Sequence, residues 1–191
     1  YNNELARQVK DMGYKAVLAE GADHILGWRS PNYVYAPKGA QGLKLLLKNY
    51  KLSDDIAFRF SDQKWKEWPL TTEKFSQWLN GAEGDTVNLF MDYETFGEHQ
   101  WQTTGIFNFL RNLPQEILKN QHNDFKTPSE VAAAYEPRGE LDIPFSVSWA
   151  DIERDLSAWL GNDMQKSAIR KIYLLENAQK KVTQSEAEKK Q

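Results

Sequence analysis

The first hundred residues alternate short apolar runs with segments of helical periodicity, and this alternation constrains the fold more than any other feature. Short runs occupy Ala16 to Ala19, Tyr33 to Ala36, Leu43 to Leu47 and Thr86 to Met91. Segments with helical patterns and turn residues separate several of these runs. Strands that alternate with helices favour a parallel sheet, so we expect an α/β fold, either a small open sheet or part of a barrel.

Capping residues predict where the helices begin and end. Gly13 is expected to end a first helix over Asn2 to Met12, since glycine is favoured just after a helix. Thr127 followed by Pro128 is expected to open another helix, because proline is favoured at the first helical position. Further helices are expected from Ser53 to Phe58, Thr71 to Leu79, Thr103 to Asn120, Ser148 onward, and Asn162 to Gln179.

The strands that can be recognised are fewer than a closed barrel requires. About four are visible, whereas a closed parallel barrel has about eight strand–helix units. The chain begins at Tyr1, without a Met, and the first helical pattern starts at Asn2. We therefore expect the remaining strands to lie outside this sequence.

Composition limits the class of protein. Hydrophobic residues make up 40% and aromatic residues 13% of 191 residues, which is enough for a substantial core. The net charge is −3 and no basic cluster is present, so we expect no nucleic-acid partner. No apolar run approaches the roughly 20 residues of a membrane span. The chain has no cysteine, which fits a reducing compartment, and we expect a cytoplasmic location; the oligomeric state is not predicted.

Carboxylates follow two of the apolar runs. Glu20 closes the run from Ala16 to Ala19, and Asp92 follows Met91. Because the carboxyl ends of parallel strands line the ligand crevice of α/β folds, the two side chains are expected to face one another. Glycoside hydrolysis requires such a pair of carboxyl groups: one attacks the anomeric carbon and the other protonates the leaving oxygen. Burial beside a second carboxylate helps the acid to keep its proton.

Structural roles remain open for the same carboxylates. Glu20 can cap the following turn through the Gly21 amide. Asp92 and Glu94 can cap a helix or pair with a lysine, and Glu98 is expected to be solvated or capping.

The tryptophans favour a carbohydrate ligand, because flat rings stack on the C–H faces of pyranoses. Trp28 and Trp101 lie eight and nine residues after Glu20 and Asp92, respectively, and are expected to form walls of a pocket. Trp78 and Trp159 share helical spacing with other apolar residues and are expected in the core.

Histidines raise the alternative of a metal site. His24 and His99 lie near the two carboxylates, but their spacing matches no zinc motif, so no metal or cofactor is expected. Contact with a substrate hydroxyl or a structural hydrogen bond is the preferred interpretation. His122, in a polar segment, is expected to be exposed.

Three blocks of residues resemble signature regions of family 57 of the glycoside hydrolases, and in particular its α-amylase-type members. They correspond in order to the third, fourth and fifth signature regions of that family. The blocks are Leu18-Ala19-Glu20-Gly21-Ala22-Asp23, Asp92-Tyr93-Glu94-Thr95-Phe96-Gly97-Glu98-His99, and Ser148-Trp149-Ala150-Asp151-Ile152-Glu153-Arg154-Asp155 with Trp159-Leu160-Gly161-Asn162.

The resemblance implies an activity. Glu20 would be the nucleophile and Asp92 the general acid/base of a retaining enzyme that hydrolyses or transfers α-1,4-glucans such as maltooligosaccharides, without a required metal. Trp28, Trp101, Glu94 and His99 would bind the substrate.

The resemblance also implies a fold, an incomplete (β/α)7 barrel followed by a helical bundle. Residues 1–100 would be the C-terminal part of the barrel and 101–185 a helical region packed on it, and 186–191 are expected to form a disordered tail. The family's His-Gln-Pro motif and its Gly/Trp-rich segment are absent, so the chain is expected to be a truncated catalytic domain. A non-catalytic carbohydrate-binding protein and a metal-dependent polysaccharide deacetylase remain alternatives.

Overall fold

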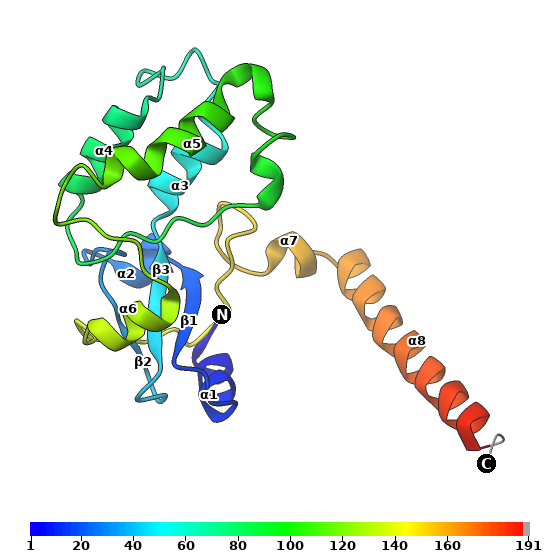
Figure 1. The fold of residues 1–191 in the computed structure, drawn as a ribbon. Helices are drawn as coiled ribbons and strands as arrows, with labels where there is room; N and C mark the ends of the chain where they lie inside the picture. Colours follow the sequence, from blue (N-terminus) through cyan, green and yellow to red (C-terminus); the bar gives the residue numbers. More distant parts are fainter. Residues whose placement is uncertain (189–191) are drawn as a thin grey trace. The chain divides into compact units, whose positions relative to one another are not determined.

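A parallel pair of strands organises the first part of the chain (Figure 1). A computed structural model describes residues 1–188, which form two units, residues 1–145 and residues from 146 onward. In the first unit, β1 (Ala16–Glu20) pairs with β3 (Lys44–Lys48), with Glu20 opposite Lys48. These are two of the strands that the apolar runs predict.

Helices pack against the side chains of both strands. Val17 contacts the cluster that holds α1 (Asn3–Asp11), and Leu46 contacts Val131 of α6 (Pro128–Ala134). Since side chains alternate along a strand, and Val17 is opposite Leu45 in the register, Val17 and Leu46 face opposite sides of the pair. The sheet is therefore covered by one helix on each face, as parallel sheets require.

The expectation of a strand from Thr86 to Met91 is wrong, because this segment forms no regular strand. The segment touches β3 through one parallel bridge between Asn88 and Lys48, supported by a 2.9 Å hydrogen bond from the Asn49 N–H to the Asn88 carbonyl. Val87, Leu89 and Met91 pack on the neighbouring helical core, and the Asn88 side chain donates a 3.0 Å hydrogen bond to the Leu47 carbonyl, in competition with a backbone hydrogen bond. The segment is nevertheless the neighbour of β3 at its carboxyl end.

A second small pairing lies elsewhere in the first unit. The run from Tyr33 to Ala36 leads into β2 (Ala36–Pro37), which pairs in parallel with β4 (Glu140–Leu141). The sequence analysis did not predict β4, because two residues are too few for a recognisable pattern.

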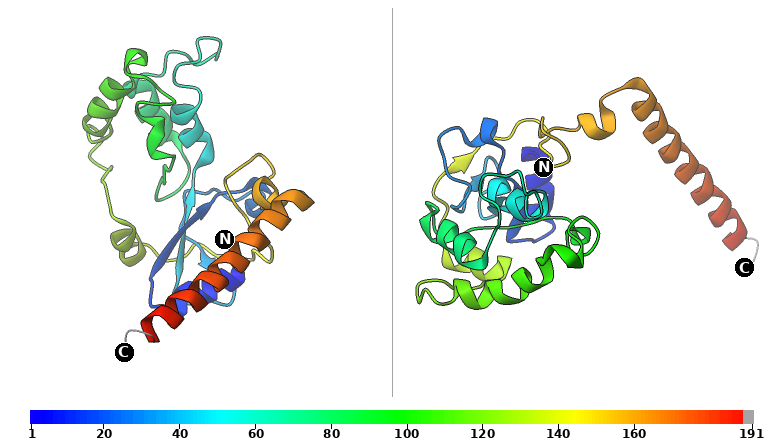
Figure 2. Two further views of the ribbon diagram at one scale, coloured as in Figure 1. Left: turned by 90° about the vertical axis from the view of Figure 1, so that its right-hand side faces the viewer. Right: turned by 90° about the horizontal axis from the view of Figure 1, so that it is seen from above.

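Three helices share the largest core. They are α3 (Tyr50–Ala57), α4 (Thr72–Gly81) and α5 (Ile106–Ile117), of which α4 and α5 lie side by side in each view (Figures 1 and 2). Short helical segments α2 (Asp23–Leu26), η1 (Tyr93–Thr95) and η2 (Gln102–Thr104) connect the larger elements. The buried members of the core are Leu52, Ile56, Phe60, Leu70, Phe75, Ile106, Phe109 and Leu113.

Most of the expected helix caps are present. The Thr71 and Thr127 side chains accept hydrogen bonds from the first turns of α4 and α6, and Gly13 follows α1 with a φ of +91°. The expected start at Ser53 is wrong. Helix α3 begins at Tyr50, because the Asn49 side chain accepts a 3.1 Å hydrogen bond from the Leu52 N–H.

The second unit contains α7 (Ser157–Leu160) and α8 (Asp163–Glu188). The helix expected from Ser148 is wrong. That segment is a turn, closed by a 3.1 Å bond from the Ser148 N–H to the Arg154 carbonyl, with Arg154 at a φ of +58°. Helix α8 continues through residues 186–188, where we expected a disordered tail, and residues 189–191 of that tail lie outside the described residues. Within residues 1–188, no helix is long and apolar enough to cross a membrane.

The division between the units falls after Phe145, whereas we expected the helical region to begin at residue 101. Helix α5 packs against α4, and β4 pairs with β2, so these elements belong to the first unit. The assignment of residues 1–100 to a barrel and 101–185 to a helical region stays a prediction.

Phe75 is expected to be a stability determinant, because its ring is fully buried between Trp78 and Phe109. Phe75→Ala should lower the free energy of unfolding in urea by about 3–5 kcal/mol, the usual cost of deleting a core aromatic ring. The control Phe125→Ala removes a ring that is more than half exposed and should change the unfolding free energy little. Equal effects of the two substitutions would contradict this description of the core.

Candidate active site

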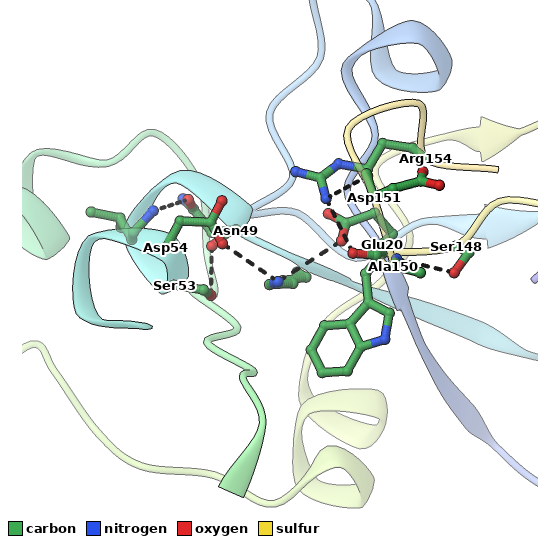
Figure 3. Close-up of polar contacts among 11 residues, drawn as sticks. Glu20, Asn49, Ser53, Asp54, Ser148, Ala150, Asp151 and Arg154 are labelled. Atoms are coloured by element: carbon green, nitrogen blue, oxygen red, sulfur yellow. Dashed lines mark hydrogen bonds and ion pairs between the residues drawn. The ribbon is translucent and has the colours of Figure 1, made fainter. Parts of the chain in front are cut away.

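Glu20 is a buried carboxylate at the carboxyl end of β1 (Figure 3). Its side chain is only 2% exposed. The register places it opposite Lys48, the last residue of β3, so both side chains leave the same face of the paired strands. The sequence predicted this strand-end position for Glu20.

Lys48 lies between two carboxylates. Its Nζ is 4.0 Å from Oε2 of Glu20 and 3.8 Å from Oδ1 of Asp54, whose side chain is 17% exposed. The Lys48 side chain is itself 6% exposed. Buried charges are usually paired, and the Lys48 ammonium is the partner of both carboxylates. The sequence analysis did not assign a role in the site to Lys48 or Asp54. Lys48 is nevertheless unusual, because it is a lysine at the end of a buried strand.

The start of α3 fixes the position of Asp54. Asn49 caps the helix and donates a 3.0 Å hydrogen bond from Nδ2 to Oδ1 of Asn32. Ser53 donates a 2.7 Å hydrogen bond to the Asn49 carbonyl (Figure 3). The next residue along, Asp55, pairs instead with Arg59 at 2.6 Å. Burial raises the pKa of Asp55, and the Arg59 guanidinium opposes that rise. The two adjacent carboxylates of α3 therefore have different partners.

Gly21 allows the ends of β1 and β3 to approach closely. A Cβ atom on this residue would lie 2.3 Å from the Lys48 carbonyl oxygen and 3.0 Å from Cβ of Pro31. Only glycine fits at this place without displacing backbone. The glycine directly after Glu20 therefore allows the ends of β1 and β3 to lie close together.

Asp92 lies in the loop that follows the Asn88 bridge, at the residue before η1. Its side chain is exposed and makes no capping hydrogen bond to η1, which leaves the capping alternative without support. The Asp92 carbonyl accepts a 3.1 Å hydrogen bond from the Thr95 N–H. The Asp92 residue is therefore exposed, on a loop whose backbone makes a hydrogen bond within the same segment.

Hydrogen bonds within the loop hold the remaining motif residues. The N–H groups of Glu98 and His99 donate to the Glu94 carbonyl at 3.2 and 3.0 Å, and all three side chains are exposed. The buried Gln100 ties the loop to α3, because its Nε2 donates a 2.9 Å hydrogen bond to the Ala57 carbonyl. Sequence reasoning gave Gln100 no role, since a glutamine beside a motif carries no signal of burial.

The tryptophans divide into exposed and packed rings. Trp28 is 93% exposed and Trp101 is 66% exposed, as a stacking surface requires. Trp78 packs against Phe75 and Trp65, which confirms its place in the core. The same expectation is wrong for Trp159, which is 47% exposed because α7 is too short to provide a buried face.

The histidines have separate surroundings. His24 stacks on Phe145 with ring centroids 5.9 Å apart, His99 is exposed in the loop after Asp92, and His122 is exposed as expected. Among residues 1–188, no group of three or more His, Asp or Glu side chains is placed to hold a metal ion.

Strand pairing relates Glu20 to the segment that leads to Asp92. Glu20 ends β1, and Lys48 of β3 is both its register partner and the bridge partner of Asn88, four residues before Asp92. The carboxyl ends of the three segments therefore point the same way. Carboxylates are groups that can serve in covalent and acid–base catalysis.

Gly21→Ala is expected to disturb this edge. The added methyl would overlap the Lys48 carbonyl, so the free energy of unfolding should fall by about 1–3 kcal/mol, the usual range for overpacking. The control Gly139→Ala places its methyl where no atom lies within 4 Å and should have little effect. Thermal and urea unfolding measure both, and an unchanged stability of Gly21→Ala would refute the close approach.

Comparison with known proteins gives consistent results. The sequence model described as Glycosyl hydrolase family 57 matches residues 1–144, which include the Glu20 and Asp92 blocks. A protein of Methanocaldococcus jannaschii named "Putative alpha-amylase" is 51% identical over 187 residues, which cover 94% of this chain and 40% of that protein. The chain thus spans about two fifths of the length of this curated relative.

A solved structure shares the fold. The 4-alpha-glucanotransferase from Thermococcus litoralis aligns with a TM-score of 0.58 at 20% identity, over 78% of this chain and 23% of that one. This similarity agrees with a mixed α/β fold. On the family match and the close relative together, the chain belongs to glycosyl hydrolase family 57.

Proposed function

We propose that this chain carries the catalytic carboxylates of a retaining glycoside hydrolase that acts on α-1,4-glucans. The observation that supports this most is the placement of Glu20, buried beside Lys48 at the strand end, with exposed Asp92 on the neighbouring segment. Membership of family 57 and the names of the two relatives support the class of reaction and substrate.

In the proposed reaction, Glu20 attacks C1 of the sugar while Asp92 gives its proton to the departing glycosidic oxygen. The bond from C1 to that oxygen breaks, and an ester between C1 and the Glu20 carboxylate forms. Asp92 then takes a proton from water, whose oxygen attacks C1 and releases Glu20. A second glucan hydroxyl in place of water would give transfer instead of hydrolysis.

The surroundings of the two carboxylates suit these roles. The Lys48 ammonium lies 4.0 Å from Oε2 of Glu20, and the carboxylate is the form that attacks C1. Exposed Asp92 can reach a leaving group and a water molecule. A retaining pair requires about 5–5.5 Å between the carboxyl groups in the complex with substrate.

Exposed side chains near the carboxylates would bind the glucan. We assign Trp28 and Trp101 to stacking on sugar rings, and Glu94 and His99 to hydrogen bonds with hydroxyl groups. Strands β1 and β3, with the segment bridged to β3 at Asn88, would belong to an incomplete (β/α)7 barrel that is followed by a helical region. We place the protein in the cytoplasm on the basis of its lack of cysteine.

Substitution of the carboxylates distinguishes their roles. Glu20→Ala and Asp92→Ala should each lower turnover of maltohexaose by at least about 10³-fold, as for loss of a nucleophile or an acid/base group. With α-maltotriosyl fluoride, whose leaving group needs no acid, added azide should restore turnover in both variants. Glu20→Ala should give the β-azide and Asp92→Ala the α-azide, which NMR identifies.

The opposite stereochemistry, or wild-type turnover in either variant, would refute the assignment. Glu98→Ala serves as the control, since it removes an exposed carboxylate of the same loop to which we assign no role.

The exposed tryptophans are expected to affect binding. Trp28→Ala and Trp101→Ala should each raise the KM for maltohexaose by about 10-fold, because a stacked ring is lost, with a smaller change in kcat. Tyr14→Ala is the control, since this exposed ring precedes β1 and lies at the amino end of the strand. Equal KM values in all three variants would rule out the stacking role.

A binding function without chemistry is the second candidate, which the exposure of Trp28 and Trp101 also favours. Calorimetry with maltohexaose separates the two. A binding protein would bind the sugar with unchanged affinity after Glu20→Gln or Asp92→Asn and would release no product from it.

A further inference from the structure

We propose that Lys48 is a positioning residue for Glu20, and that it holds the attacking carboxylate in place while it shares its charge with Asp54. The inference rests on the proposed function and adds to it a group that does not touch the substrate.

The argument begins with the register of the sheet. Glu20 and Lys48 are the last residues of β1 and β3 and are Cα partners, so the strand pairing places their side chains together independently of the loops. Both side chains are almost fully buried. The Nζ of Lys48 lies near the carboxylates of Glu20 and Asp54, so we assign it a role that acts through Glu20.

The distances indicate an electrostatic role. Nζ of Lys48 lies 4.0 Å from Glu20 and 3.8 Å from Asp54, both beyond the usual length of a direct hydrogen bond. The ammonium thus sits between the two carboxylates and attracts both through a poorly screened interior. An ammonium that lies between two carboxylates attracts each of them less strongly than an ammonium in direct contact with one carboxylate.

Asp54 sets where the ammonium lies. It belongs to α3, whose first turn is fixed by Asn49 directly after β3. The charged groups that face Lys48 in the first unit therefore come from both neighbouring elements, Glu20 of β1 and Asp54 of α3. Without the Asp54 charge, the Lys48 ammonium should remain beside Glu20. Without the Lys48 charge, the Glu20 carboxylate should lose an electrostatic contact that fixes its position.

The test compares variants of Lys48 with a matched lysine of the same strand. Lys48→Met removes the charge, Lys48→Arg keeps it, and Asp54→Asn removes the second carboxylate. The control Lys44→Met acts at the other end of β3, where the lysine is mostly buried and pairs with Glu136 at 3.3 Å. Thermal unfolding checks that each variant is folded, and Lys48→Gln replaces Lys48→Met if the latter does not fold.

Turnover of maltohexaose gives the first measurement. Lys48→Met should lower kcat by about 10²-fold with KM changed less than about 3-fold, the loss expected when a reacting group is misplaced. Lys48→Arg should recover at least about 10-fold of that loss, and the control Lys44→Met should stay within about 3-fold of the parent. Asp54→Asn should lower kcat less than Lys48→Met, because the ammonium remains beside Glu20. Unchanged kcat in Lys48→Met, or an equal loss in Lys44→Met, would overturn the proposal.

Carbon-13 NMR of the Glu20 carboxyl gives a measurement that does not depend on activity. Its titration midpoint in the folded chain should rise by about one pH unit in Lys48→Met and stay unchanged in Lys44→Met. An unchanged midpoint in Lys48→Met would overturn the proposal. If Glu20→Gln kept full turnover, the proposed function would fail, and the NMR result would still decide whether Lys48 holds Glu20.

Discussion

The candidate site depends on the ion pairs that Lys48 forms with Glu20 and Asp54. They place three charges at the carboxyl end of a small parallel sheet, where each side chain is largely removed from water. The ammonium offsets part of the charge of the two carboxylates, and its two ion pairs link β1, β3 and α3. Gly21 makes the arrangement possible because no larger residue fits against the Lys48 carbonyl.

The helical core supports the second carboxylate in a different way. Val87, Leu89 and Met91 pack on the core of α3, α4 and α5, and this packing leads the chain from the Asn88 bridge to Asp92. Beyond Asp92, Gln100 anchors the loop to the end of α3. One helix, α3, thus contacts both halves of the candidate site, through Asp54 on one side and the Ala57 carbonyl on the other.

Local sequence signals predicted the elements that depend on neighbouring residues. The apolar runs gave β1 and β3, and Thr71 and Thr127 marked the starts of α4 and α6, because strand burial and helix capping are encoded within a few positions. Glu20 was found at its strand end for the same reason. The failures involve contacts distant in sequence: Thr86 to Met91 pack on helices instead of completing a strand, and β4 pairs with a partner about a hundred residues away.

The buried part of the site was harder to predict than the exposed part. Asp92, His99 and Trp101 belong to a motif that is visible in the sequence, and the structure places them on one ordered loop or its end. Lys48, Asp54 and Gln100 look like ordinary surface residues in the sequence, because their burial depends on the pairing of β1 with β3 and on the position of α3.

The most direct measurement is the chemical trapping of the intermediate. A fluorinated α-glucosyl fluoride that slows hydrolysis of the glycosyl-enzyme should leave one sugar covalently bound to the protein, and mass spectrometry of its peptides should locate the sugar on Glu20. A label on a different carboxylate, or turnover with inversion at the anomeric carbon and no labelled peptide, would contradict the account.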